Sequence, residues 1–420
     1  MSKHLFLAAS AVVLIMLAAL LLGCGSDSAI VPTRFLIVAD FDNNRVLIYD
    51  APPSTAESAS VVLGQADFTT ATADIAAAAA VGGGPTASTM SGPAATAVDS
   101  AGNLYVAENG NCRVTQFMPP FSSGMSASVA FGQPDLVTGN CAAATSASSL
   151  GNAVHVDQVF GVAVDRSGNL WVADSGSNRV LEYKPPFSNG MAATVAIGQA
   201  NLTTGSPNQG GATPTSATLS DPAYPVFDAA GNLWISDFFN NRLLEFKPPF
   251  ATGMAASVVV GQADFTHGSA NQGGAIANNT FHGGDGPAFD REGNLWVPDA
   301  FNHRVLEFVP PFRTNMQSSL VLGQADFVHG AANQGGAAPT SATLNFPHQV
   351  AFDSDGNLYV TDAGNNRVLV FMPPFSDGMN ASLVLGQANF TSASAATTAT
   401  GQDFPAGVIT APPNSGSSLF

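Results

Sequence analysis

The chain has 420 residues, of which 45% are hydrophobic, so it is long enough to bury a large core. Its formal net charge is −17, with 30 acidic residues against 13 lysines and arginines. Six of these basic residues are single arginines of a repeated motif, and no Lys or Arg cluster is present that could neutralise phosphates. The composition therefore argues against nucleic-acid binding.

The first segment, 1–23, has the features of an export signal. An apolar run over residues 5–22 is short for a membrane-spanning helix and typical of a secretory signal. It leads into a Leu-Leu-Gly-Cys motif that ends at Cys24 and resembles the lipobox of bacterial lipoproteins. The resemblance implies lipidation of Cys24, a linker over 24–33, and a place in the bacterial cell envelope, in the periplasm or on the outer membrane or cell surface. The lipid would be the only membrane contact. The alternative is an ordinary signal peptide with a chance cysteine.

Two further cysteines, Cys112 and Cys141, remain once Cys24 is set aside. In an oxidising envelope, two such cysteines are often paired. A bridge between them would close a loop of about 30 residues and contribute roughly 3 kcal/mol by the chain-entropy argument. We therefore expect a disulfide.

One sequence motif occurs six times along the chain. In its third copy it combines a D-x-x-G-N-L-W-V-x-D run, an N-R-V-L-E run, Pro-Pro-Phe and Gly-Gln. The motif arginines recur every 62 to 68 residues, at Arg45, Arg113, Arg179, Arg242, Arg304 and Arg367. The repeat units lie near 34–68, 92–136, 159–202, 223–265, 286–327 and 347–390.

Each unit contains four short runs that read as β-strands with turn residues between them. In the third copy we expect strands over 161–164, 170–173, 179–183 and 193–197. Asp and Gly-Asn form the first turn, and Pro-Pro ends the third strand because proline cannot donate a hydrogen bond to a ladder. The following phenylalanine and a later methionine read as core residues.

Four antiparallel strands per unit, repeated six times, predict an all-β, six-bladed β-propeller. The motif resembles the NHL repeat over about residues 36–387, although the units are longer than is usual for that family. The first copy lacks its first strand, and Phe404-Pro405-Ala406 near the C-terminus matches Phe346-Pro347-His348. We therefore expect segment 404–420 to supply the inner strand of the N-terminal blade and to close a single propeller over 34–420.

Each motif arginine is preceded, five positions earlier, by an acidic residue. These residues are Asp40, Glu108, Asp174, Asp237, Asp299 and Asp362. The same pair in six equivalent places indicates a structural ion pair, because a catalytic site would have to break the symmetry of the repeat.

In an up-and-down meander, the loop between the second and third strands lies at the same end as the long insertions after Gly-Gln. Loops commonly carry function, so we assign function to this face. Three insertions contain Asn-Gln-Gly-Gly. These residues could bind a sugar or a peptide, or they could form hydrogen bonds within their own loop. Because the same segment recurs in neighbouring blades, we favour the structural role. We expect a non-catalytic binding or scaffold protein that offers this face to a protein, peptide or glycan. The sequence does not indicate an oligomeric state.

The alternative is a lyase or hydrolase with a metal in the central channel, because some six-bladed relatives use channel residues in this way. The residues that break the repeat near the starts of inner strands are His155, Asp221, His282, Asp285 and His348. Such side chains could bind zinc or calcium, but no HxxxH or HExxH spacing supports a site. We therefore expect no cofactor, no metal and no catalytic residue.

Overall fold

The structure is a computed structural model that describes residues 34–51, 53–73, 84–152 and 158–411. The expected signal segment 1–23, Cys24, the linker 24–33 and His155 lie outside the described residues. Within the described ranges, no helix has the length and apolar character needed to cross a bilayer.

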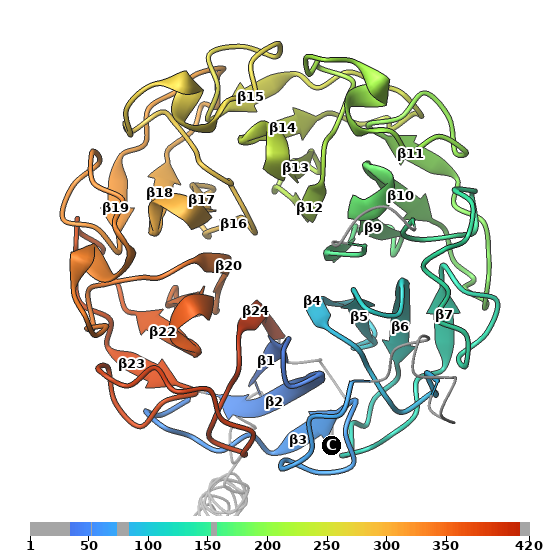
Figure 1. Cartoon of the computed structure of the whole chain (residues 1–420), viewed down its shortest axis with the longest axis horizontal. Coiled ribbons are helices and arrows are strands. Elements are labelled where there is room, and N and C mark those ends of the chain that lie inside the picture. Colours follow the sequence, from blue (N-terminus) through green and yellow to red (C-terminus); the bar gives the residue numbers. More distant parts are fainter. Residues whose placement is uncertain (1–33, 52, 74–83, 153–157, 412–420) are drawn as a thin grey trace, which may run out of the picture. The chain divides into compact units, whose positions relative to one another are not determined.

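Six antiparallel sheets of four strands form the blades of a ring (Figure 1). From the inner strand outwards, blade 1 has β24 (Pro405–Ala411), β1 (Arg34–Asp40), β2 (Arg45–Ala51) and β3 (Val61–Leu63). Blade 2 has β4 (Pro93–Val98), β5 (Leu104–Glu108), β6 (Arg113–Phe117) and β7 (Val129–Phe131). Blade 3 has β8 (Gly161–Val164), β9 (Leu170–Asp174), β10 (Arg179–Tyr183) and β11 (Val195–Ile197).

The other three blades follow the same order. Blade 4 has β12 (Pro222–Phe227), β13 (Leu233–Asp237), β14 (Arg242–Phe246) and β15 (Val258–Val260). Blade 5 has β16 (Ala288–Phe289), β17 (Leu295–Asp299), β18 (Arg304–Phe308) and β19 (Leu320–Leu322). Blade 6 has β20 (Pro347–Phe352), β21 (Leu358–Asp362), β22 (Arg367–Phe371) and β23 (Leu383–Leu385). The predicted six-bladed propeller is confirmed.

Blade 1 is completed by the two ends of the ring. Strand β24 pairs antiparallel with β1, with Ile409 opposite Ile37. Val408 is fully buried, and its N–H donates to Oε1 of Gln349 in blade 6 at 2.8 Å. The C-terminal strand thus joins blade 1 to its neighbour and covers the edge that β1 would otherwise expose. The predicted closure is confirmed.

The hydrophobic core lies between neighbouring blades. Trp171 of blade 3 is fully buried, and its ring centroid lies 4.9 Å from that of Phe250, which follows β14 in blade 4. Trp234 of blade 4 and Phe312 of blade 5 repeat this contact at 5.0 Å. The Pro-Pro-Phe phenylalanines therefore pack against the core and join their blades to the preceding ones; blade 1 has Ser54 at this position.

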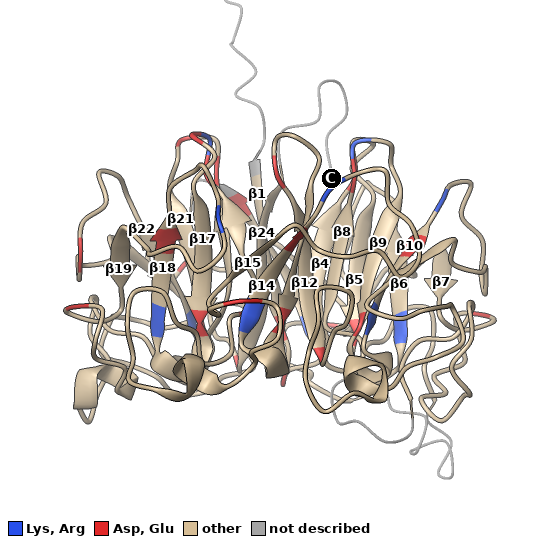
Figure 2. Ribbon diagram, turned by 90° about the horizontal axis from the view of Figure 1, so that it is seen from above, with Lys and Arg blue, Asp and Glu red and all other residues tan. Residues whose placement is uncertain are grey.

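The loops between the second and third strands lie at the same end of the strands as the long insertions, as the edge-on view in Figure 2 shows. In four blades this loop forms a short 3₁₀ helix: η2 (Ser175–Ser177), η4 (Phe238–Asn240), η6 (Ala300–Asn302) and η8 (Ala363–Asn365). Three insertions contain another: η3 (Pro207–Gly210), η5 (Ala270–Gly273) and η7 (Ala332–Gly335). Gln199 of the Gly-Gln pair links the two regions, because its Nε2 donates to Asn178 O at 3.0 Å and to Ser206 O at 2.9 Å.

The Asn-Gln-Gly-Gly segments close on themselves. In the insertion of blade 3, Nε2 of Gln209 donates to Ala217 O at 3.1 Å and to Gly198 O at 3.3 Å. Oδ1 of Asn208 accepts a hydrogen bond from Thr218 in the same insertion at 3.3 Å. The Asn208 amide also pairs with that of Asn240 in the adjoining loop, so these amide groups are used within and between the loops, which agrees with the structural reading of the repeated segment.

Candidate functional site

A cavity of about 290 Å³ opens where the inner strands begin. Its lining comes from five blades and consists of Phe41, Phe160, Asp221, Ala223, Phe238, Phe239, Asp285, Phe301, Phe346, His348 and Phe404. Seven of these side chains are phenylalanines, and the polar groups are two carboxyls and one imidazole. The described lining thus combines a large aromatic surface with a few acidic groups, as in many small-molecule sites.

One position of the repeat supplies much of the inner wall. Asp285 and His348 each lie five residues before the aspartate that opens the first turn of their blades, Asp290 and Asp353. Phe160 and Ala223 occupy the same position in blades 3 and 4, and both line the cavity. The fold therefore directs this position of the inner strand towards the central cavity.

Asp285 and His348 form a buried pair. Oδ2 of Asp285 lies 2.6 Å from Nδ1 of His348, and the two side chains are 1% and 6% exposed. The backbones of the adjoining strands fix this approach, because Gly286 N–H donates to His348 O at 2.8 Å and Gly286 O accepts from Val350 N–H at 3.1 Å. Nε2 of His348 has no hydrogen-bonding partner among the described residues. This nitrogen is buried in the cavity wall, so only a ligand that enters the cavity could approach it.

Asp221 enters the cavity from the strand start of blade 4. It is 5% exposed, and its φ of 54° is in the left-handed region, where aspartate is one of the few tolerated side chains. Its N–H donates to Oδ1 of Asn178 in blade 3 at 2.9 Å, and its carbonyl accepts from Phe238 N–H at 3.3 Å. These backbone bonds hold the carboxyl at the cavity wall.

The phenylalanines form an almost continuous collar. Ring centroids of Phe238 and Phe301 lie 5.9 Å apart, and those of Phe301 and Phe346 lie 4.9 Å apart. The series continues from Phe346 to Phe404 at 6.1 Å and from Phe404 to Phe41 at 6.1 Å. Imidazole and collar are in contact, since the His348 ring lies 4.7 Å from Phe346 and 5.2 Å from Phe404.

Tyr224 reaches from blade 4 to two other blades of the ring. Its hydroxyl reaches from blade 4 to the carbonyl oxygens of Ala406 in blade 1, at 3.0 Å, and Ala94 in blade 2, at 3.3 Å. Its ring contacts Phe160 with a centroid distance of 5.8 Å. The side chain is 2% exposed and belongs to the buried core between blades.

Of the five channel candidates from the sequence, three meet in this cavity: Asp221, Asp285 and His348. His282 does not line it; the ring of His282 packs on Phe301 at 4.7 Å, and the backbone N–H of His282 donates to Oδ1 of Asp299. His155 lies outside the described residues. No cluster of three or more His, Cys, Asp or Glu side chains suited to a metal ion occurs in the described parts of the chain.

Sequence reasoning missed the phenylalanine collar. Phe41 and Phe238 directly follow the acid of the acid–arginine pair, whereas Phe346 and Phe404 directly precede an inner strand. Other copies carry small or polar residues at these places, for example Ser175 after Asp174. The departure from the repeat at these positions was the available signal.

The acid–arginine pairs do not line the cavity and are fully buried. Their Nε–carboxylate distances are 2.6 Å for Arg45–Asp40, 3.0 Å for Arg113–Glu108, 2.6 Å for Arg179–Asp174, 2.7 Å for Arg242–Asp237, 2.8 Å for Arg304–Asp299 and 2.6 Å for Arg367–Asp362. In blade 4, Arg242 also donates to Phe265 O at 2.6 Å, Thr215 O at 2.9 Å and Thr218 O at 3.0 Å. Each such arginine ties its blade to the insertions on both sides.

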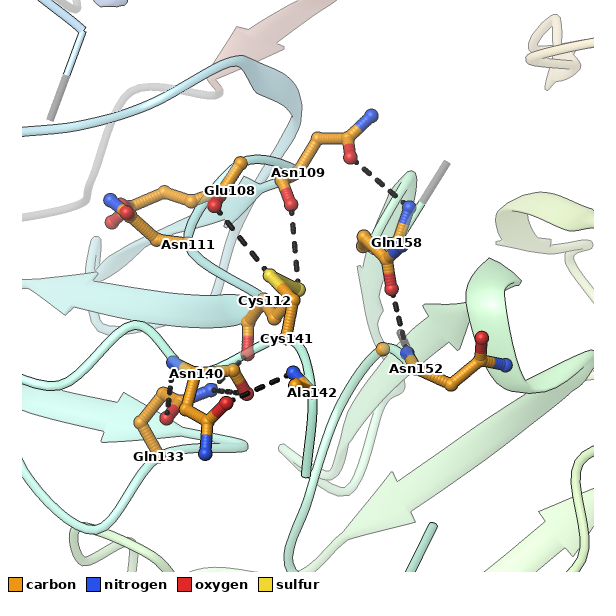
Figure 3. Close-up of a disulfide and its surroundings, with 12 residues drawn as sticks. Glu108, Asn109, Asn111, Cys112, Gln133, Asn140, Cys141, Ala142, Asn152 and Gln158 are labelled. Atoms are coloured by element: carbon orange, nitrogen blue, oxygen red, sulfur yellow. Dashed lines mark hydrogen bonds between the residues drawn. A yellow bond between two sulfur atoms is a disulfide. The ribbon is translucent and has the colours of Figure 1, made fainter. Parts of the chain in front are cut away.

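The predicted disulfide is confirmed. Cys112 and Cys141 are joined across a sequence separation of 29 residues. Figure 3 shows the bridge beside Asn109, whose Oδ1 accepts the N–H of Gln158 at 3.1 Å. The bridge thus braces the loop that connects blade 2 to blade 3.

Comparison with known proteins agrees with this architecture. Residues 90–117, 161–183 and 344–371 match the NHL repeat. The chain therefore carries NHL repeats within a six-bladed β-propeller. Among curated proteins, none matches the sequence.

Several solved structures resemble the ring. A chain of a nidogen–laminin complex is 15% identical, with 90% of this chain and 98% of that chain covered and a TM-score of 0.49. A periplasmic gluconolactonase from Pseudomonas aeruginosa is 12% identical over 90% and 99%, with a TM-score of 0.47. A virginiamycin B lyase from Staphylococcus aureus is 10% identical over 82% and 83%, with a TM-score of 0.41. At these values the likenesses assign neither activity nor ligand to this chain.

Proposed function

We propose that this protein is a non-catalytic binding protein of the bacterial cell envelope, and that its ligand occupies the phenylalanine-lined cavity. The observation that carries the proposal is the convergence of seven phenylalanines from different blades on one cavity that also contains Asp285 and His348. Burial of aromatic surface would supply the affinity, and the polar groups would set the orientation of the ligand. The cavity lies at the loop-bearing end, where a protein, peptide or glycan could present a side group.

Two features support the envelope location. The lipobox-like motif ending at Cys24 precedes the propeller in the sequence. The Cys112–Cys141 disulfide is typical of proteins that fold in an oxidising compartment. Labelling with a radioactive fatty acid, with Cys24→Ala as the control, tests the anchor: label retained in the variant would contradict lipidation at Cys24.

Saturation-transfer NMR with a neutral aromatic probe, 2-naphthylmethanol, tests binding in the cavity. Phe301 is 42% exposed at the cavity wall, so Phe301→Ala should fold and weaken binding about fivefold, the value of one lost aromatic contact. Met372→Ala is the matched control, because Met372 is 41% exposed and does not line the cavity. Absence of probe binding to the wild type, or equal binding by both variants, would contradict the proposal.

A second candidate is a lyase or hydrolase, and the Asp285–His348 pair favours it. A carboxylate that holds one imidazole nitrogen leaves the other available as a general base. Elemental analysis of the purified protein tests the metal-dependent form of this alternative. Stoichiometric zinc or calcium that is lost in His348→Ala would favour the enzyme over the binding protein.

A further inference from the structure

The ionisable side chains of the cavity wall are mainly acidic. The described lining contains two carboxyls, those of Asp221 and Asp285, one imidazole, and no lysine or arginine. Both carboxyls are at least nine-tenths buried, at 5% and 1% exposure. When both carboxyls are ionised, the described lining carries two negative groups and no lysine or arginine. An anionic ligand would therefore be repelled, while a cation would complement the wall.

The aromatic collar adds to the same preference. The face of a phenylalanine ring carries the negative lobe of its quadrupole and attracts a cation placed within about 6 Å of the centroid. The collar rings are 4.9 to 6.1 Å from their neighbours, so several rings surround one space. Phe239 and Phe301 are 50% and 42% exposed, and they place aromatic surface where the cavity meets solvent.

The side chains of the lining suit an organic ammonium ion better than a bare metal ion. A bare metal ion needs several oxygen, nitrogen or sulfur ligands, and no suitable cluster of three such side chains occurs in the described ranges. Seven phenylalanines offer no such donors but can bury the alkyl groups of an organic ammonium ion. Nε2 of His348, which has no hydrogen-bonding partner in the described structure, can serve a polar group on the same ligand.

We propose that the cavity recognises an organic ammonium group, held by the phenylalanine faces and by the carboxyls of Asp221 and Asp285. This inference rests on the proposed binding function and specifies the chemical class of the ligand. The ammonium group belongs to a small molecule or to the exposed end of a larger one.

Calorimetric titration with two isosteric probes tests the charge requirement. Choline and 3,3-dimethylbutan-1-ol have the same shape and hydroxyl group and differ in the positive charge. We expect the wild-type protein to bind choline at least tenfold more tightly than the neutral alcohol. Equal or tighter binding of the alcohol, or failure to bind choline by a protein that binds 2-naphthylmethanol, would overturn the inference and leave the proposed function intact. Failure of all three probes would overturn both.

Two variants test the groups involved. Asp221→Asn removes the charge and suits the left-handed backbone, since asparagine tolerates positive φ; we expect the preference for choline to fall below threefold. The control Glu292→Gln, at an exposed acid outside the cavity, should leave the preference unchanged. Phe301→Leu keeps apolar bulk but loses the ring face, so choline binding should weaken about fivefold while binding of the alcohol stays constant. An unchanged preference in both Asp221→Asn and Phe301→Leu would contradict the assignment.

Discussion

Cys112 and Cys141 are joined at a place where four other blades use an asparagine. In blade 4, for example, Asn241 occupies the position of Cys112, and its Nδ2 donates to Gly268 O at 2.9 Å. Both Cys112 and Asn241 have a left-handed backbone, with φ of 50° and 51°. The disulfide therefore replaces a hydrogen bond between the strand-connecting loop and the following insertion.

Because the disulfide stands where other blades have a hydrogen bond, we expect removal of the disulfide to destabilise the protein and an asparagine at position 112 to restore part of the loss. Replacing both cysteines by alanine should lower the free energy of unfolding by about 3 kcal/mol, because the bridge no longer constrains the unfolded chain. The variant Cys112→Asn with Cys141→Ala should recover about 1 kcal/mol, since asparagine suits the backbone and can restore the bond of the other blades. Urea unfolding under non-reducing conditions measures both. A double alanine variant as stable as the wild type would contradict the role of the bridge.

Closure of the ring by β24 predicts a strong effect of C-terminal truncation. A chain ending at Gly401 lacks β24, which contributes the fully buried residues Ala406 and Val408. Blade 1 would then expose its edge at β1, and we expect the melting temperature to fall by more than about 10 °C. A chain ending at Ala411 keeps β24 and is the control, expected to melt like the full chain. Equal melting of the two truncated chains would refute this form of closure.

The fold was predictable because its determinants are local and repeated six times. In blade 3, β8 (Gly161–Val164) and β10 (Arg179–Tyr183) have the bounds expected from the sequence. Turn aspartates, paired prolines and the incomplete first copy each have a direct backbone consequence. Their agreement across copies removes the ambiguity that a single short strand would carry.

The candidate site was predictable only in part. Asp285 and His348 share one position in adjacent blades, so an alignment on the turn aspartate places them side by side. The collar does not follow in the same way. Phe346 and Phe404 have φ of 56° and 51°, a conformation unusual for bulky residues, so strand alternation does not give the direction of their side chains. Phe41 and Phe404 come together only when the ring closes.

Arg242 gives the last prediction, because its four hydrogen bonds hold two insertions and one buried carboxylate. Replacing it by methionine removes one partner of a buried pair and should cost about 3–5 kcal/mol of unfolding free energy. Burial already raises the pKa of Asp237, and the arginine opposes this shift. Without the arginine, the pKa of the folded-state carboxyl rises further above its unfolded value.

A carboxyl with a raised folded-state pKa binds its proton more tightly in the folded protein, so its contribution to stability is present at low pH and lost as the pH rises. The Arg242→Met variant has a lower free energy of unfolding than the wild type. We expect this difference to shrink as the pH is lowered from 7.5 to 5.5. Arg242→Lys keeps a positive charge beside Asp237 but cannot make all four bonds, so it should be destabilised without this recovery. Urea unfolding of the three proteins at both pH values measures the difference. A constant deficit of Arg242→Met across this range would show that Asp237 remains ionised without its arginine.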